Sequence, residues 1–127
     1  MSAYELDTDA REIAARLAAP DTLLVACLCA AWCDTCRAYR SIFDALANLY
    51  PGLCFVWIDI ETHADRLEAL DIENFPTIVI EDMHCTRFFG AVPAKKRVLE
   101  RLIDHFMREG RAQTDSEPSL RPMLAMK

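Results

Sequence analysis

The sequence has no excess of basic residues and no long apolar segment. Its 127 residues include 14 Lys and Arg against 20 Asp and Glu, with a formal net charge of -6 and a pI of about 5.0. A nucleic-acid-binding protein needs a basic face to replace phosphate counterions, so this balance argues against that class and against acidic partners. The longest apolar run, Leu23–Trp32, is about half the length of a membrane-spanning helix.

The first residues also lack the features of an export signal. Met1–Asp7 is acidic where a signal peptide is basic, and no apolar segment follows it. Internal repeats, low-complexity segments and flavin or nucleotide motifs are absent as well. We therefore expect a cytoplasmic chain without a membrane partner, in which six cysteines are more typical of catalytic or buried thiols than of a disulfide framework.

What the sequence does contain is enough apolar residues for one globular core. Hydrophobic residues make up 53% of the chain and charged residues 27%, which is typical of a folded domain. We expect this domain over residues 1–109. Residues 110–127 contain two prolines and have no clear period, so they are predicted to be a flexible C-terminal tail.

The hydrophobic pattern alternates between strands and helices. Two continuous apolar runs, at 22–29 and 53–60, are typical of strands covered on both faces. From Cys33 the spacing becomes helical and ends at Pro51–Gly52. The pattern predicts an α/β fold with a central mixed β-sheet and helices on both faces. The other predicted elements are a strand at 4–6, helices at 7–18 and 64–70, antiparallel strands at 74–82 and 85–90, and a helix beginning at Pro93.

Four of the cysteines lie within ten residues, in the stretch CLCAAWCDTC. Cys33 and Cys36 fall where a buried strand gives way to a helix, and the unpaired N–H groups and partial positive charge of a helix N-terminus stabilise a thiolate there. A three-residue offset places both sulfurs on one face of the first turn. We therefore predict that Cys33 attacks a disulfide and that Cys36 resolves the mixed disulfide.

Several segments resemble the thioredoxin family, over Tyr4 to about Arg108. AAWCDTCR at residues 30–37 is similar to the active-site segment of that family, including Trp32 before the first cysteine. FPT at residues 75–77 is similar to the segment that carries its cis-proline. VWIDIE at 56–61 stands where the family has its central strand, and FFGAV at 88–92 is near the glycine region that precedes its last helix.

The resemblance implies a thioredoxin-like fold and a thiol-disulfide oxidoreductase that reduces protein disulfides. Its substrate would dock along Phe75, a cis Pro76 and Thr77, where exposed backbone can pair with an extended chain. A reductase of the thioredoxin-reductase type, or another dithiol donor, would recharge the cysteine pair. No cofactor beyond the redox-active Cys33 and Cys36 is implied.

The chain also departs from the family pattern beside the active site. Asp34 and Thr35 replace the usual Gly-Pro between the cysteines, and the carboxylate beside Cys33 partly offsets the helix dipole. Cys27 stands where the family has a buried aspartate, and Trp57 where it has the partner lysine. Either water reaches the site, or Glu61 or another group gives general-base help to the resolving thiol, or the exchange is slow.

The remaining cysteines allow other interpretations. Cys27 and Cys29 lie two apart on a buried strand, so they share a face and are read as small core residues, as is Cys54. One alternative is a metal-binding protein that uses the Cys27–Cys36 cluster, although a buried strand seldom supplies tetrahedral ligands. Another is a redox-weak binding or chaperone-like module on the same fold. A redox relay to Cys27 is not supported by spacing alone.

Overall fold

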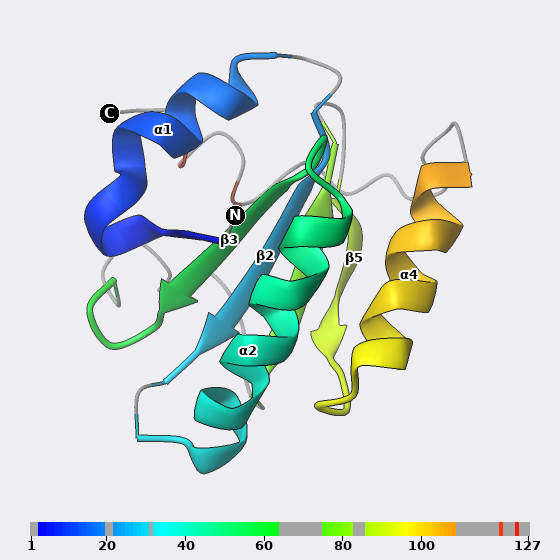
Figure 1. The fold of residues 1–127 in the computed structure, drawn as a ribbon. Helices are drawn as coiled ribbons and strands as arrows, with labels where there is room; N and C mark the ends of the chain where they lie inside the picture. Colours follow the sequence, from blue (N-terminus) through cyan, green and yellow to red (C-terminus); the bar gives the residue numbers. More distant parts are fainter. Residues whose placement is uncertain are drawn as a thin grey trace.

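The alternating apolar segments fold into one sheet with helices on both faces (Figure 1). In the computed structural model, the described residues are 3–19, 22–30, 32–63, 75–82, 86–108, 120 and 124. This arrangement confirms the predicted α/β class with a mixed central sheet. The elements are β1 (Tyr4–Glu5), α1 (Leu6–Leu17), β2 (Leu24–Cys29), α2 (Asp34–Leu49), β3 (Cys54–Asp59), β4 (Thr77–Glu81), β5 (Thr86–Ala91) and α4 (Lys96–Arg108).

The strand β2 lies at the centre of the sheet, whose order is β1-β3-β2-β4-β5. It pairs in parallel with β3 and antiparallel with β4, and β1 and β5 occupy the two edges. All six residues of β2 are buried, as expected for a strand that reads as a continuous apolar run. Cys27 lies opposite Trp57 on one side and Ile78 on the other.

The pleat of β2 sorts its side chains onto two different faces. Val25, Cys27 and Cys29 belong to the hydrophobic cluster that α2 and α4 cover, which we call the helix-pair face. Leu24, Ala26 and Leu28 belong to the cluster that α1 covers, which we call the α1 face. The two layers give the central strand a dry environment on both sides.

The helix α2 packs on the helix-pair face through an aromatic cluster. Phe43 is fully buried, and its ring centroid lies 5.2 Å from that of Phe55 and 5.8 Å from that of Trp57. Tyr39 and Leu46 of the same stripe are also fully buried. Ile42 and Tyr50 of α2 pack against the cluster while only partly buried, so one face of this helix is turned to the core, as its helical spacing predicted.

Two predicted segments differ from the structure or lie outside it. The last helix begins at Lys96 rather than at Pro93, because Lys95 N–H donates to the Pro93 carbonyl at 2.7 Å in a turn before the helix. The helix predicted at 64–70 lies outside the described residues, and so do residues 83–85 between the two predicted antiparallel strands.

The predicted C-terminal tail contains two buried residues. Leu120 and Leu124 are 1% and 3% exposed and pack in the cluster of the α1 face. The Leu120 N–H donates to the carboxylate of Glu81, which is itself fully buried, at 3.2 and 2.9 Å. The other residues after 108 lie outside the described residues. For them, the flexible C-terminal tail stays a prediction.

Among the described helices, none has both the length and the apolarity that crossing a membrane requires.

Candidate active site

Cys33 occupies the junction between the central strand and α2. It is the N-cap of α2, with extended backbone angles of φ -85° and ψ 117°. Its N–H donates to the Ala30 carbonyl at 3.0 Å, and its own carbonyl accepts the Arg37 N–H at 3.1 Å. These two bonds hold Cys33 at the helix start, where its partly exposed side chain is a free thiol beside the exposed indole of Trp32.

Cys36 lies one turn further along α2, and it is buried and bonded to Cys29. The structure contains a disulfide between Cys29 and Cys36, whose Cα atoms are 5.8 Å apart. The two residues meet because Cys29 ends β2 on the helix-pair face and the first turn of α2 packs over that end. The sequence-based pairing of Cys36 with Cys33 is thus not the one present in this structure.

Sequence reasoning found Cys29 as a buried residue but missed its bond. Both cysteines are 1% exposed, so the assignment of Cys29 to the core describes its surroundings correctly. The available signal was the period of two along β2, which puts Cys29 on the same face as Cys27. The position of the α2 first turn over that face is a tertiary contact, and no local pattern reports it.

Cys27 is the third sulfur of this group. Its Sγ lies 3.6 Å from the Sγ of Cys29, within reach of a weak S–H hydrogen bond. Burial raises the pKa of the Cys27 thiol far above that of an exposed thiol, and the positive charge of Arg40 opposes this only in part. At neutral pH Cys27 is therefore a neutral thiol and cannot accept a proton as a carboxylate would.

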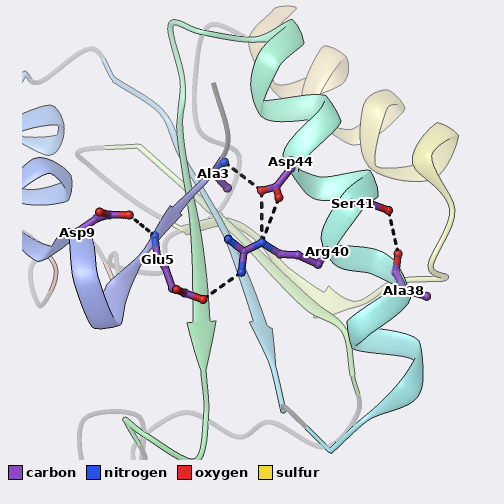
Figure 2. Close-up of polar contacts among 7 residues, drawn as sticks. All are labelled: Ala3, Glu5, Asp9, Ala38, Arg40, Ser41 and Asp44. Atoms are coloured by element: carbon purple, nitrogen blue, oxygen red, sulfur yellow. Dashed lines mark hydrogen bonds and ion pairs between the residues drawn. The ribbon is translucent and has the colours of Figure 1, made fainter.

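Arg40 brings a positive charge to the place where Trp57 stands on β3. Its guanidinium carbon lies 5.1 Å from the centroid of the Trp57 ring, in a cation–π contact. The same group forms ion pairs with Glu5 at 3.0 Å and Asp44 at 3.3 Å (Figure 2). Asp44 also accepts the Ala3 N–H at 3.1 Å, so this network ties β1 to α2. A cation is thus present near Cys27, although it comes from α2.

A cleft of about 340 Å³ opens beside Cys36. Its lining includes two carboxylate side chains, those of Glu5 and Asp59. The Asp59 carboxylate accepts the backbone N–H groups of Glu61 at 2.8 Å and Thr62 at 3.4 Å, which fixes its position. Glu61, a predicted source of general-base help, does not line this cleft. The full lining is Glu5, Ala30, Cys36, Arg37, Arg40, Trp57 and Asp59.

The predicted substrate segment, Phe75–Thr77, contacts Trp32, the residue that precedes Cys33. The Phe75–Pro76 peptide bond is cis. The Phe75 ring packs edge-to-face on Trp32, with centroids 5.8 Å apart and an interplanar angle of 82°. Pro76 and Thr77 are buried, and the Pro76 carbonyl accepts the Val92 N–H at 3.1 Å. This segment and Trp32 together form an aromatic edge next to Cys33.

The two residues between the cysteines point to solvent. Asp34 and Thr35 are exposed, and the Asp34 carboxylate pairs with Arg37 one turn later. Exposed ion pairs contribute little to stability because both charges remain hydrated. The pair does place a counter-charge beside the carboxylate that follows Cys33. Asp34 is therefore not an isolated negative charge next to the thiol.

Among the residues that the structure describes, no group of three or more His, Cys, Asp and Glu side chains is arranged to hold a metal ion. The sulfurs of Cys29 and Cys36 are bonded to each other, and Cys33 projects at the helix start. Cys85, the sixth cysteine of the sequence, lies outside the described residues.

The fold and the cysteine site together identify the family. A family model described as Thioredoxin matches residues 6–104. The chain is 30% identical over 104 residues to a thioredoxin of Ophiophagus hannah, a match that covers 78% of this chain and 94% of the relative. The chain therefore belongs to the thioredoxin family. This confirms the resemblance on which the sequence analysis relied.

Other relatives match over a smaller share of their length. A protein named Putative thioredoxin H10, from Arabidopsis thaliana, is 35% identical over 57 residues, and the match covers 45% of this chain and 37% of the relative.

Solved structures agree with the fold. A wild-type thioredoxin h from poplar superposes with a TM-score of 0.73 at 21% identity, covering 84% of this chain and 97% of that one. A chain of a ferredoxin:thioredoxin reductase and thioredoxin f2 complex gives a TM-score of 0.69 at 19% identity. This match covers 84% of this chain and 96% of that one. At these identities the likeness concerns the fold alone.

Proposed function

We propose that this protein reduces protein disulfides by dithiol-disulfide exchange through Cys33 and Cys36. Membership of the thioredoxin family supports thiol-disulfide oxidoreductase chemistry in general. The observation that carries the finer proposal is the free thiol of Cys33 at the N-cap of α2, beside the exposed Trp32. Helix N-H groups and the helix dipole favour the thiolate that attacks a disulfide.

In the proposed reaction, the Cys33 thiolate attacks one sulfur of a substrate disulfide. A bond forms between Cys33 and that sulfur, and the other substrate sulfur leaves as a thiolate and takes a proton. The thiolate of Cys36 then attacks the Sγ of Cys33. The second substrate sulfur leaves, so the substrate gains two electrons and the protein holds a disulfide. The reaction requires Cys36 to be released from Cys29 beforehand.

The proton of Cys36 leaves through the cleft beside it. Cys27 cannot take that proton, because burial keeps it a neutral thiol. Glu5 and Asp59 line the same cleft as Cys36, and water between them and the sulfur would connect the two. In this proposal the carboxylates of the cleft replace the buried aspartate of other family members.

The proposed substrate surface is the aromatic edge of Trp32 and Phe75 with the buried Pro76 behind it. Proposed partners are proteins with accessible disulfides, and a reductase or other dithiol donor that returns two electrons. A fold neighbour was solved in a complex with ferredoxin:thioredoxin reductase, which supports a donor of this general kind. We also propose a reducing, cytoplasmic setting and no cofactor other than the chain's own sulfurs.

Insulin reduction tests this function directly. The purified protein, kept reduced with a low concentration of dithiothreitol, should accelerate the precipitation of insulin chains, and Cys33→Ser should abolish the acceleration. With Cys36→Ser, mixed disulfides through Cys33 should accumulate, because the resolving thiol is gone. Cys33→Ser is the matched control, since it removes a thiol of the same motif and should trap nothing.

The opposite result would favour another function. A wild-type protein that does not accelerate insulin reduction, together with a Cys36→Ser variant that traps no protein, would overturn the proposal. It would instead support the redox-weak binding or chaperone-like module.

A further inference from the structure

Cys36 has two cysteines within reach rather than one. It is bonded to Cys29, which comes from the end of β2, and it lies three residues after Cys33 on the first turn of α2. With that bond in place, Cys33 remains a free thiol. The structure therefore shows a chain that contains a disulfide and still has a free, partly exposed thiol at Cys33.

We propose that Cys29 is a third redox-active cysteine, which takes Cys36 from Cys33 after each reduction and leaves Cys33 free to react again. The inference rests on the proposed function, because a substrate supplies the oxidising equivalents. Two disulfides of Cys36 then alternate: one with Cys33, formed by the substrate, and a buried one with Cys29.

The exchange balances without any added oxidant. The thiolate of Cys29 attacks the Sγ of Cys36 in the Cys33–Cys36 disulfide, so a Cys29–Cys36 bond forms and the Cys33–Cys36 bond breaks. Cys33 leaves as a thiolate, and the proton released by Cys29 balances its charge. The number of disulfides and thiols in the chain is unchanged. The two electrons given to the substrate remain the only net transfer.

Burial and helix position both favour this direction of exchange. Cys29 and Cys36 are each 1% exposed, so their disulfide is shielded from external thiols, whereas Cys33 is partly exposed. The leaving sulfur belongs to the N-cap residue of α2, and the N-terminal end of a helix dipole favours negative charge. The Cys27 thiol, 3.6 Å from the Cys29 sulfur, can donate a hydrogen bond to Cys29 when its disulfide opens.

The exchange changes what the protein does to its next substrate. In the Cys29–Cys36 form, Cys33 can attack a second disulfide, but Cys36 cannot resolve the product. The mixed disulfide at Cys33 then persists until an external dithiol reduces the chain. An oxidised molecule would therefore hold its client covalently, whereas a fully reduced molecule releases it.

Mapping the disulfide after oxidation tests the exchange. The reduced protein is freed of reductant and given one equivalent of oxidised glutathione; samples are quenched in acid over time and their thiols are blocked with N-ethylmaleimide. Cleavage before Asp21 and Asp34 separates Cys36 from the other three cysteines of the stretch. Tandem mass spectrometry then shows whether the cross-link to Cys36 comes from Cys29 or from Cys33.

We expect a Cys33–Cys36 link at early times and a Cys29–Cys36 link with alkylated Cys33 at late times. In Cys29→Ala the late form should be lost and Cys33 should stay linked to Cys36. Cys54→Ala is the matched control, because Cys54 lies buried on the α1 face and its removal should leave the late link in place. The wild-type time course decides the question even where a variant folds poorly.

The two proposals fail differently in this experiment. Normal insulin reduction with a Cys33–Cys36 link at every time point would overturn the role of Cys29 and leave the proposed function standing. A Cys29–Cys36 link that persists in a protein unable to reduce insulin would overturn the proposed function, and the exchange with it.

Discussion

The two faces of the central sheet differ in the kind of residue that they bury. The helix-pair face holds the aromatic cluster around Phe43 and the sulfurs of Cys27, Cys29 and Cys36. The α1 face holds mainly aliphatic side chains such as Leu24, with one cysteine, Cys54. The difference arises because β2 alternates its side chains and α2 begins over only one side. The three neighbouring sulfurs that can take part in thiol exchange therefore lie on the helix-pair face, and the α1 face is a structural core.

The faces also differ in whether their buried polar atoms have hydrogen-bond partners. On the helix-pair face, the hydroxyl of Tyr39 is buried and has no hydrogen-bond partner among the described residues. On the α1 side, the buried carboxylate of Glu81 accepts bonds from the Leu120 N–H and the Thr86 hydroxyl, the latter at 3.3 Å. A satisfied polar group stabilises its surroundings, whereas an unsatisfied one costs free energy. The comparison therefore gives opposite predictions for removing each group.

The largest stability effect is expected at the aromatic cluster. Phe43→Ala should lower the free energy of unfolding by about 3 to 5 kcal/mol, because it leaves a cavity between Phe55 and Trp57. Ile13→Val, on the α1 face, is the milder comparison and should cost about 0.5 to 1.5 kcal/mol. Urea denaturation of both variants measures the difference. A smaller loss for Phe43→Ala than for Ile13→Val would contradict the central packing role of Phe43 in the aromatic cluster.

A smaller loss is expected when an amide replaces the buried side-chain carboxyl group of Glu81. Glu81→Gln weakens the acceptor of the Leu120 N–H and should lower stability by about 1 to 3 kcal/mol. Because that bond holds Leu120 on the α1 face, cleavage near Leu120 in limited proteolysis should also become faster. Glu61→Gln, at an exposed position, is the control and should change neither measurement. Unchanged proteolysis of Glu81→Gln would argue against this anchoring role.

The third prediction concerns pH and Cys27. Its pKa in the folded state is raised above that of the unfolded chain, mainly by burial. The unfolded chain therefore loses this proton first as pH rises, and the stability that Cys27 contributes is present below about pH 8.5 and is lost above it. Wild-type stability should fall by up to about 1.4 kcal/mol per pH unit more steeply than that of Cys27→Ala.

Denaturation of the reduced proteins at intervals from pH 8 to pH 10 measures these slopes. Parallel curves for wild type and Cys27→Ala would show that Cys27 is not the group responsible. Cys54→Ala, which removes a buried thiol from the α1 face, serves as the comparison variant.

The smallest effect is expected from the unpartnered hydroxyl. Tyr39→Phe removes a buried polar atom that has no partner among the described residues, so it should be neutral or stabilise the fold by up to about 1 kcal/mol. Tyr50→Phe is the matched control. The Tyr50 hydroxyl donates to Asp104 at 2.6 Å, and burial together with this bond raises the pKa of Tyr50 to about 12. Thermal unfolding should rank Tyr39→Phe above Tyr50→Phe, and the reverse order would contradict the comparison.

Much of this molecule could be predicted from local sequence patterns. The continuous apolar runs predicted the buried strands, and the helical spacing after Cys33 predicted α2, because both depend on neighbours within a few residues. The WCDTC motif, which is also local, located the candidate nucleophile Cys33. The roles of Cys27 and Trp57 were harder to predict: their neighbour Arg40 comes from α2, which brings its charge to β3 only in the packed fold.

The sequence by itself determined the family, the strand-to-helix position of Cys33 and the sorting of Cys27 and Cys29 onto one face. The family follows from short motifs such as WCDTC, and the other two follow from helix capping and from the period of two in a strand, all of which are local properties. Only the tertiary structure decided that Cys36 meets Cys29 and that Glu81 binds the Leu120 N–H, 39 residues away in the chain. Such contacts depend on how separate elements pack together, and that packing has no local signature.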